Sequence, residues 1–515
     1  MPSRPNFLIF VTDQMRADHM GCAGNPVIRT PHLDALAAEG VRCSRAYVNN
    51  PLCMPSRATL FTGLTPRAHE VRTNGIPLDP RFPTMPAALA RAGYRTHSVG
   101  KIHLTPYGTP KGVDPASLTP SAWPEASAMW GRGLVREVPV PYFGLQGVEV
   151  TLGHGPGTGG DYRRWLRAQD PKAEALLAPE AGRPSRTGAE NCWHSAIPEE
   201  LHYNTWVAAR AIAFLESHPM GEPFFLWCSF PDPHHPYCPP EPWASRYHPA
   251  DIPLPTRREG ELADLPPHYR LMYETGHPTA GRFGPTHMGD DQIREILALT
   301  YGMISHVDDC IGRVMAALER SGRRQDTVVC FLSDHGDMMG DHWIINKGPF
   351  HFQGLLGVPF IWSAPGRFPA GRTCAGLASF LDFAPTVLDL AGVPIPEGPT
   401  PPEPESPGHL PPWPGRSLAP MLTGAAEGVQ DSVVVENDED YLGLRLRTLI
   451  TDRWWLTAYP GQEYGELFDL EADPGQLHNL WHAPPAREIK RDLLIQLMER
   501  LVETDSTLPR RLCHA

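Results

Sequence analysis

Two pairs of polar residues directly follow apolar runs that are typical of buried strands. Asp13 and Gln14 come after residues 7–11, and Asp334 and His335 come after residues 327–332. In open α/β sheets ligands bind outside the carboxyl ends of the strands, so we expect the two pairs to converge. Two carboxylates, an amide oxygen and an imidazole form a mixed oxygen and nitrogen site for a divalent cation. Taken singly, an aspartate after a strand is more often a turn or capping residue, so the hypothesis depends on what lies between the pairs.

A third candidate lies between these pairs, in the sequence Cys53-Met54-Pro55-Ser56-Arg57. A cysteine at the start of a helix can be a thiolate nucleophile with a lowered pKa, or it can simply pack in the interior. Local chemistry alone favours packing.

Strands and helices that could position these residues alternate along the chain. The apolar runs predict buried strands at 7–11, 94–99, 223–230, 327–332 and 358–363, and the helical patterns cover 30–40, 84–93, 205–217 and 291–321. This alternation predicts an α/β sandwich around a central parallel sheet.

Two regions break the alternation and are typical of long functional loops, residues 105–200 and 236–290. The proline-rich segment 394–415 predicts a connector between a large domain, 1–393, and a smaller α+β domain, 416–515. The smaller domain is expected to hold antiparallel strands at 431–436, 441–451 and 453–458, followed by a helix at 485–503.

Composition excludes several classes of function. A net charge of −13 over 515 residues argues against a nucleic-acid partner, which requires a basic surface. No apolar stretch reaches 18 residues and the run at 7–11 is too short for a signal peptide, so we expect a cytoplasmic protein without a membrane partner. The ten cysteines contain no CxxC pair, which favours buried free thiols over disulfides or structural zinc.

The segment from Cys53 to Arg57 resembles the signature of type I sulfatases, the formylglycine-dependent members of the alkaline phosphatase superfamily. Further elements resemble that family in the expected order: residues 6–13, the TPHLDALAAEG helix at 30–40, GKIHL at 100–104, PHHPY at 233–237, SDHGD at 333–337 and ELFDLEADP at 466–474. One departure is Leu64, where the family usually has arginine after the Thr-Gly that follows the signature. The resemblance implies an alkaline-phosphatase-like sandwich, with a large, mostly parallel central sheet and a smaller C-terminal α+β domain.

The resemblance also implies a mechanism, carried over residue by residue. A formylglycine-generating enzyme would oxidise Cys53, and the hydrated aldehyde would attack the sulfur of a small-molecule sulfate ester to give a covalent sulfoenzyme. Its second hydroxyl would then expel sulfate. The resemblance further implies one Ca²⁺ or Mn²⁺ ion, held by Asp13, Gln14, Cys53, Asp334 and His335. Arg57 and Lys101 would orient the diol and the sulfate oxygens, and His103 would accept the proton of the second hydroxyl. His234 and Lys347 would contact the leaving oxygen, and Asn74 would be a further substrate contact.

Gln14 and His335 stand where many sulfatases have Asp and Asn, and this pairing resembles choline sulfatases and phosphonate monoester hydrolases. A phosphonate monoester hydrolase or phosphodiesterase is therefore a rival hypothesis, although Lys101 and His103 resemble the sulfatase pair. Two further hypotheses are a metal- and oxyanion-binding protein with unconverted Cys53, and a Cys-His peptidase.

The motifs do not specify the alcohol part of the substrate. Four aromatic residues in the first long loop are a candidate cation-binding box, and ordinary loop packing explains them equally well: Trp123, Trp130, Trp165 and Trp193. The roles of His235, His342 and His351 stay open. The oligomeric state stays open as well, and a homo-oligomer is one hypothesis.

Overall fold

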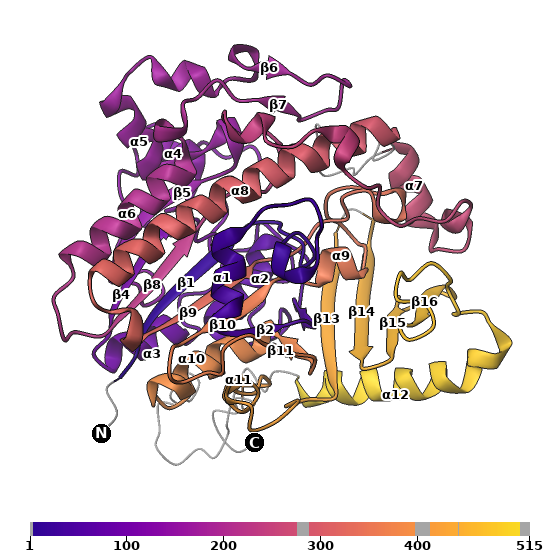
Figure 1. Ribbon diagram of the computed structural model, residues 1–515. Coiled ribbons are helices and arrows are strands. Elements are labelled where there is room, and N and C mark those ends of the chain that lie inside the picture. Colours follow the sequence, from indigo (N-terminus) through magenta and orange to yellow (C-terminus); the bar gives the residue numbers. More distant parts are fainter. Residues whose placement is uncertain (1–3, 276–287, 397–412, 441, 505–515) are drawn as a thin grey trace.

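The central element is an eight-stranded sheet with helices on both faces (Figure 1). The computed structural model describes residues 4–275, 288–396, 413–440 and 442–504. In spatial order the strands are β11 (Arg372–Cys374), β2 (Val41–Cys43), β10 (Phe360–Ser363), β9 (Thr327–Ser333), β1 (Asn6–Thr12), β8 (Phe224–Ser229), β4 (Arg95–Gly100) and β5 (Gly147–Leu152). Only β10 runs antiparallel to its neighbours among these strands, so the predicted mostly parallel sheet is confirmed.

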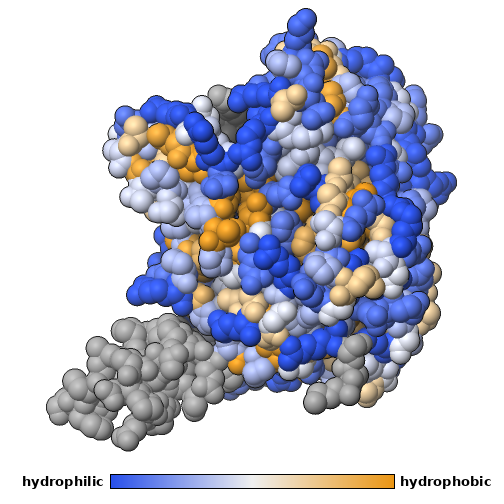
Figure 2. All heavy atoms as spheres, turned by 90° about the vertical axis from the view of Figure 1, so that its left-hand side faces the viewer, coloured by the Kyte–Doolittle hydropathy of each residue, from blue (hydrophilic) through white to orange (hydrophobic). Residues whose placement is uncertain are grey.

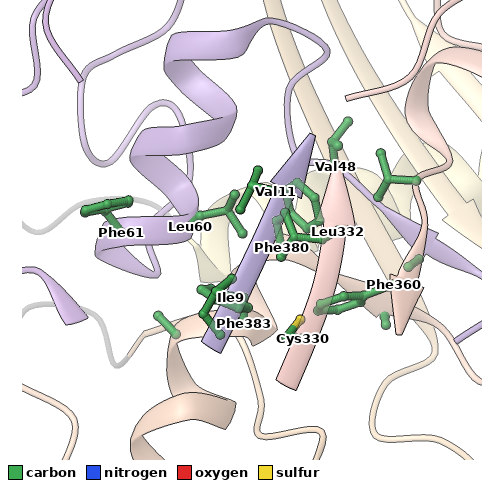
Figure 3. Close-up of a cluster of buried hydrophobic side chains, with 14 of the residues drawn as sticks. Ile9, Val11, Val48, Leu60, Phe61, Cys330, Leu332, Phe360, Phe380 and Phe383 are labelled. Atoms are coloured by element: carbon green, nitrogen blue, oxygen red, sulfur yellow. The ribbon is translucent and has the colours of Figure 1, made fainter. Parts of the chain in front are cut away.

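Strand β1 shows why the apolar runs lack a polar face. Phe7, Ile9 and Val11 pack into one hydrophobic core, and Leu8 and Phe10 pack into the other. Because successive side chains of a strand point to opposite faces, a strand covered on both sides must be apolar throughout. Figure 3 shows Ile9 and Val11 among the side chains of the first core.

The helices divide between these two cores. Helices α2 (Cys53–Thr62), α3 (Met85–Arg91) and α10 (Phe383–Ala391) contribute to the first core, and α1 (Pro31–Ala38), α6 (Tyr203–Ser217) and α8 (Asp290–Arg320) to the second. Thr84 caps α3, since its hydroxyl accepts the Ala87 N–H. Thr30 makes no side-chain cap to α1 and instead accepts a hydrogen bond from the Gly21 N–H.

The first long region is only partly loop. It supplies the sheet's edge strand β5, which the sequence analysis missed, and helices α4 (Ser127–Gly131) and α5 (Gly160–Gln169). The second long region holds α7 (Pro267–Thr275). Other short strands and α-helices along the chain are β3 (Ala46–Tyr47), β6 (Arg183–Pro184), β7 (Trp193–His194), β12 (Ala378–Ser379), α9 (Gln353–Leu356) and α11 (Ala419–Thr423). The alternation signal failed for β5 because Gly147, Val148 and Glu149 are only half-buried at the sheet edge.

The C-terminal part forms a second, antiparallel sheet in the order β13 (Ser432–Glu439), β14 (Leu444–Thr451), β15 (Trp454–Ala458) and β16 (Gly465–Asp469). Helix α12 (Arg487–Glu503) packs on it through Leu493 and Leu497. This sheet reaches the large domain, because the Glu436 N–H donates to the Asn49 carbonyl (2.8 Å). Most of the proposed connector, 397–412, lies outside the described residues.

The cysteines of the described part of the chain agree with the prediction of buried free thiols. Within that part, no helix is both long and apolar enough to cross a membrane. Figure 2 shows a mostly hydrophilic face interrupted by small apolar patches. All nine described cysteines are free, and all except the half-buried Cys22 are buried.

A buried carboxylate in the second sheet gives a stability prediction. Glu466 on β16 accepts hydrogen bonds from the hydroxyls of Tyr269 (2.5 Å) and Tyr459 (2.9 Å), and burial raises its pKa to about 7. A carboxyl whose pKa is higher in the folded chain contributes stability below its unfolded pKa and loses it as the pH rises through the folded pKa. Ionisation of Glu466 is therefore expected to destabilise the fold between about pH 4.5 and 7.

The variant Glu466→Gln carries no ionisable group at this position, so its unfolding free energy is not expected to fall over this pH range. Relative to it, the wild type should lose up to about 3 kcal/mol of unfolding free energy between pH 5 and pH 8. Denaturant midpoints of both proteins at the two pH values measure the difference. Glu463→Gln, at an exposed neighbouring glutamate, is the control, and a difference that stayed constant with pH would contradict the prediction.

Candidate active site

Cys53 is the first residue of helix α2 and lies where strands β1 and β9 end. The helix start is fixed by two asparagines: Asn50 Oδ1 accepts the Leu52 N–H (2.9 Å) and Asn74 Oδ1 accepts the Met54 N–H (3.0 Å). Asn74 thus lies beside Cys53 as a capping group, with its side-chain nitrogen left for ligand contact. Its predicted contact with substrate stays a prediction.

The two polar pairs converge, as the strand-end argument predicted, and Cys53 lies beside them. Cys53 Sγ lies 3.2 Å from His335 Nε2 and 3.8 Å from Asp13 Oδ1. His335 Nε2 is also 3.6 Å from Asp13 Oδ1 and 3.7 Å from Asp334 Oδ1. Ligand atoms of Asp13, Cys53, Asp334 and His335 all lie within 4.8 Å of one another, a spacing that one metal ion can bridge.

Gln14 lies beside the same cluster, since its backbone N–H donates to Asp334 Oδ1 (3.1 Å). Its backbone lies in the left-handed region (φ 66°), which is unusual for a residue other than glycine and frequent at functional sites. Its side-chain nitrogen contacts Asp337 Oδ2 and His235 Nδ1, whereas its oxygen Oε1 is buried without a hydrogen-bond partner. A buried acceptor without a donor is costly, so this oxygen suits a cation.

Three basic side chains surround the cluster. Lys347 Nζ lies 2.9 Å from both Cys53 Sγ and His335 Nε2, and the fully buried Lys101 ammonium contacts Asp13 Oδ2. Arg57 Nε donates to Asp334 Oδ2 (2.7 Å), and its Nη2 is buried with no hydrogen-bond partner. The structure therefore brings together all the predicted cationic residues.

The charges around Cys53 lower the pKa of its thiol. Burial and the charge of Asp13 oppose ionisation of Cys53, but Lys101, Lys347 and His335 outweigh them and hold the pKa of the thiol below its usual value. Burial likewise opposes ionisation of Asp13, yet the adjacent Lys101 keeps the pKa of that carboxyl well below its usual range. Cys53 thus sits in the electropositive surroundings that are typical of a reactive cysteine.

His103 is held by a clasp that the sequence analysis did not find. Glu125, fully buried, accepts the backbone N–H groups of His103 (2.6 Å), Leu104 (2.9 Å) and Thr105 (2.9 Å), and also the Tyr142 hydroxyl (2.7 Å). This clasp fixes His103 in the left-handed region (φ 61°). Burial, reinforced by the charge of Lys101, lowers the pKa of His103 well below its usual range, so the ring is neutral.

The strand end before His103 requires a glycine. Gly100 has φ 95°, and a Cβ there would lie 1.9 Å from the Ser229 carbonyl oxygen. Only glycine lets the backbone turn so close to β8 just before Lys101, whose ammonium contacts Asp13 in the cluster.

His154 is the second residue that the sequence analysis missed. Its Nε2 lies 2.9 Å from Lys101 Nζ and 3.2 Å from Asp13 Oδ2, and its ring stacks on that of His234 with centroids 3.6 Å apart. Burial and the charge of Lys101 lower the pKa of His154 to about 4. The only sequence signal was its position in a glycine-rich stretch, GHGPGTGG, after an unrecognised strand.

The histidines left open by the sequence separate into two groups. His235 contacts Gln14 at the site, whereas His342 stacks on Phe352 (centroids 3.7 Å apart) and His351 contacts the Thr448 hydroxyl (2.6 Å). His342 and His351 therefore pack in the interior and do not contact the cluster around Cys53.

The four tryptophans of the first long region lie in different surroundings. Trp123 and Trp130 pack around a small separate cluster with Met129, Trp165 packs near Tyr162 (centroids 6.1 Å apart), and Trp193 is buried beside Gly182. They do not form one cation-binding box, so that hypothesis is not supported.

Comparisons with known proteins agree with this geometry. Residues 5–393 match the model of the Sulfatase family, and residues 340–503 match the N-sulphoglucosamine sulphohydrolase C-terminal model. An arylsulfatase from Clostridium perfringens is 28% identical over 504 residues, covering 96% of this chain and 95% of the relative. The multifunctional alkaline phosphatase superfamily protein PehA from Trinickia caryophylli is 29% identical over 553 residues, covering 98% and 97%.

Among solved structures, a phosphonate monoester hydrolase from Agrobacterium radiobacter superposes with a TM-score of 0.79 at 26% identity, covering 98% of this chain and 97% of that one. The match extends over both sheets, which confirms the predicted alkaline-phosphatase-like fold.

Proposed function

Because the chain belongs to the sulfatase family, we propose that it hydrolyses a sulfate monoester with a formylglycine derived from Cys53. The observation that carries the proposal is the position of Cys53, which begins a helix within one cluster of two carboxylates, an imidazole and two lysines. The arylsulfatase relative supports hydrolysis rather than oxyanion binding alone.

The residues fit one divalent cation, which Asp13, Gln14, Asp334 and His335 would hold together with residue 53. His335 Nδ1 contacts the Gly336 carbonyl (2.8 Å), which leaves Nε2 for the cation, and the unpartnered Oε1 of Gln14 adds a neutral oxygen. Oxygen-rich donors suit Ca²⁺ or Mn²⁺. Such an ion would supply Lewis-acid stabilisation of the anionic ester and lower the pKa of the attacking hydroxyl.

The remaining steps fall to the chain's own groups. One hydroxyl of the hydrated residue 53 attacks sulfur, and the bond from sulfur to the alcohol oxygen breaks with its electron pair on that oxygen. The proton of the attacking hydroxyl passes to the alcohol oxygen, and a sulfate ester of residue 53 forms. Lys347 and His234 stabilise the leaving oxygen, while Arg57 Nη2 and Lys101 donate to the sulfate oxygens. The neutral ring of His103 then takes the proton of the second hydroxyl, the bond from carbon to the sulfate oxygen breaks, and the aldehyde is restored.

Hydrolysis of phosphonate monoesters or phosphodiesters is the second candidate. It is favoured by Gln14 and His335 in the cation site and by the likeness to the phosphonate monoester hydrolase. Lys101 and His103 favour hydrolysis of a sulfate ester, because they resemble the lysine and histidine pair of sulfatases.

Parallel values of kcat/KM distinguish these candidates. We expect 4-nitrophenyl sulfate to be cleaved faster than bis(4-nitrophenyl) phosphate and a phenylphosphonate monoester by the purified, metal-loaded enzyme. A phosphodiester value far above the sulfate value would instead support the second candidate.

The clasp made by Glu125 gives a further prediction. Glu125→Gln preserves shape but turns an amide N–H₂ group toward backbone N–H donors, which leaves a buried donor without a partner. We expect kcat to fall about tenfold or more as His103 loses its position, since about 1–3 kcal/mol is at stake. Steady-state kinetics measure the change, and Glu137→Gln at an exposed glutamate is the control; equal rates for the two variants would contradict the role of the clasp.

A further inference from the structure

His154 reaches the site from outside every motif described above. It follows the edge strand β5 and precedes Gly155, where a Cβ would lie 2.6 Å from Pro236 Cγ. The turn is therefore packed against the segment that carries His234. This packing holds the His154 ring against the cluster, while 18% of its side chain stays exposed.

The contacts of His154 restrict what its ring can do. A lysine ammonium has three N–H donors and no acceptor. One donor of Lys101 goes to Asp13 Oδ2, and a second lies 2.9 Å from His154 Nε2. Nε2 also lies 3.2 Å from Asp13 Oδ2, but the contact with the ammonium is shorter and Asp13 Oδ2 already accepts from Lys101, so we assign Nε2 as the acceptor, with the ring hydrogen on Nδ1. No third acceptor for Lys101 Nζ lies within hydrogen-bond distance among the described residues.

Two fixed donors determine the direction of the third, because the three N–H bonds of an ammonium are tetrahedral. Without His154, the group could rotate about its bond to carbon while keeping the contact with Asp13. The parallel stacking of His154 on His234, at an angle of 7°, keeps the accepting nitrogen in place.

We propose that His154 is a positioning residue that locks the Lys101 ammonium, so that its third N–H points at a sulfate oxygen of the bound ester. The inference rests on the proposed function. It adds a residue from the first long region to the sulfate-binding apparatus.

A competing interpretation is a second cation, because Asp13, His154 and His234 also present ligand atoms within 4.8 Å of one another. The Lys101 ammonium already uses the accepting atoms of Asp13 and His154, so a second cation would have to displace a buried positive charge. The geometry favours the ammonium lock.

Two substitutions separate the accepting atom from the ring. His154→Gln keeps an acceptor near the position of Nε2 without the ring, and His154→Phe keeps the ring without the acceptor. We expect kcat to fall about 10- to 30-fold in His154→Phe with little change in KM, and to stay within about threefold of wild type in His154→Gln. The exposed His482→Phe is the control.

Coupling to Lys101 is the sharper test. In a Lys101→Met background, adding His154→Phe should cost less than about twofold, because the ammonium that His154 orients is gone. Additive losses, or a larger loss in His154→Gln than in His154→Phe, would overturn the proposal. Two metal ions per chain in the wild type and one in His154→Gln would also overturn it, in favour of a second cation.

Binding of inorganic sulfate to the metal-loaded protein, measured by calorimetry, keeps this test separate from turnover. The affinity is expected to fall about fivefold in His154→Phe and less than about twofold in His154→Gln. If the wild type hydrolysed no sulfate ester, the proposed function would fail while this series still tested His154. Equal affinities in wild type and His154→Phe would refute the lock itself.

Discussion

Replacing Cys53 with alanine is expected to lower kcat/KM for the sulfate ester by about 10⁴-fold or more, the scale seen when an enzyme loses its nucleophile. The side chain is buried at the centre of the cluster, 2.9 Å from Lys347 Nζ and 3.2 Å from His335 Nε2, so no neighbouring group can replace it. Steady-state assays measure the loss. Cys22→Ala, away from the cluster and half-buried, should retain the wild-type rate, and a Cys53→Ala enzyme within about tenfold of wild type would refute the nucleophile.

Cys53→Ser tests the chemistry of the second step. A serine offers one hydroxyl, whereas the hydrated aldehyde offers two, and only the second can expel sulfate by restoring a carbonyl. We expect at most one turnover per chain and a peptide heavier by one sulfate group. Sustained turnover in Cys53→Ser would show that no aldehyde is needed.

The mass of the tryptic peptide 46–57, after alkylation with iodoacetamide, reports directly on residue 53. An unalkylated, aldehyde-reactive peptide lighter than the thiol form is expected from a host that carries the converting enzyme. A fully alkylated thiol in an active preparation would contradict the formylglycine mechanism.

Removal of the divalent cation is expected to have the second-largest effect, a fall in kcat of about 10³-fold. Loss of Lewis-acid stabilisation amounts to several kcal/mol, and each 1.36 kcal/mol is worth about a factor of ten. Asp13, Asp334 and His335 are all buried and present ligand atoms within 4.8 Å of one another. Lys101 and Arg57 already pair with the two carboxylates, so removal of the ion takes away its Lewis-acid effect rather than the fold's charge balance. Chelation followed by titration with Ca²⁺ or Mn²⁺ measures both the loss and the recovery.

Gln14→Ala provides the matched variant for this experiment. It removes the unpartnered Oε1, so half-maximal reactivation should need about 10- to 100-fold more metal. Gln462→Ala, at an exposed glutamine, should reactivate as the wild type does. Full activity after exhaustive chelation, with metal content verified as zero, would exclude the proposed role of the ion.

Much of the fold could be predicted from the sequence because its signals are local. The doubly buried strands β1, β8 and β9 are continuous apolar runs, and α3 carries its own cap in Thr84. Strand β5 could not be predicted this way, because it begins half-buried and is bounded by glycines that resemble a loop.

The sequence by itself predicted that the two polar pairs would meet, since strand ends in one sheet share an edge. That Cys53 and the basic residues would join them was implied by the resemblance of their motifs to those of a known family. Only the tertiary structure decided which further groups reach them. Glu125 and His154 act through side-chain contacts with segments 22 and 53 positions away, and neither contact has a periodicity or spacing that sequence could show. The orientation of Gln14 is decided in the same way, because Asp337 and His235 contact its nitrogen and leave its oxygen without a hydrogen-bond partner.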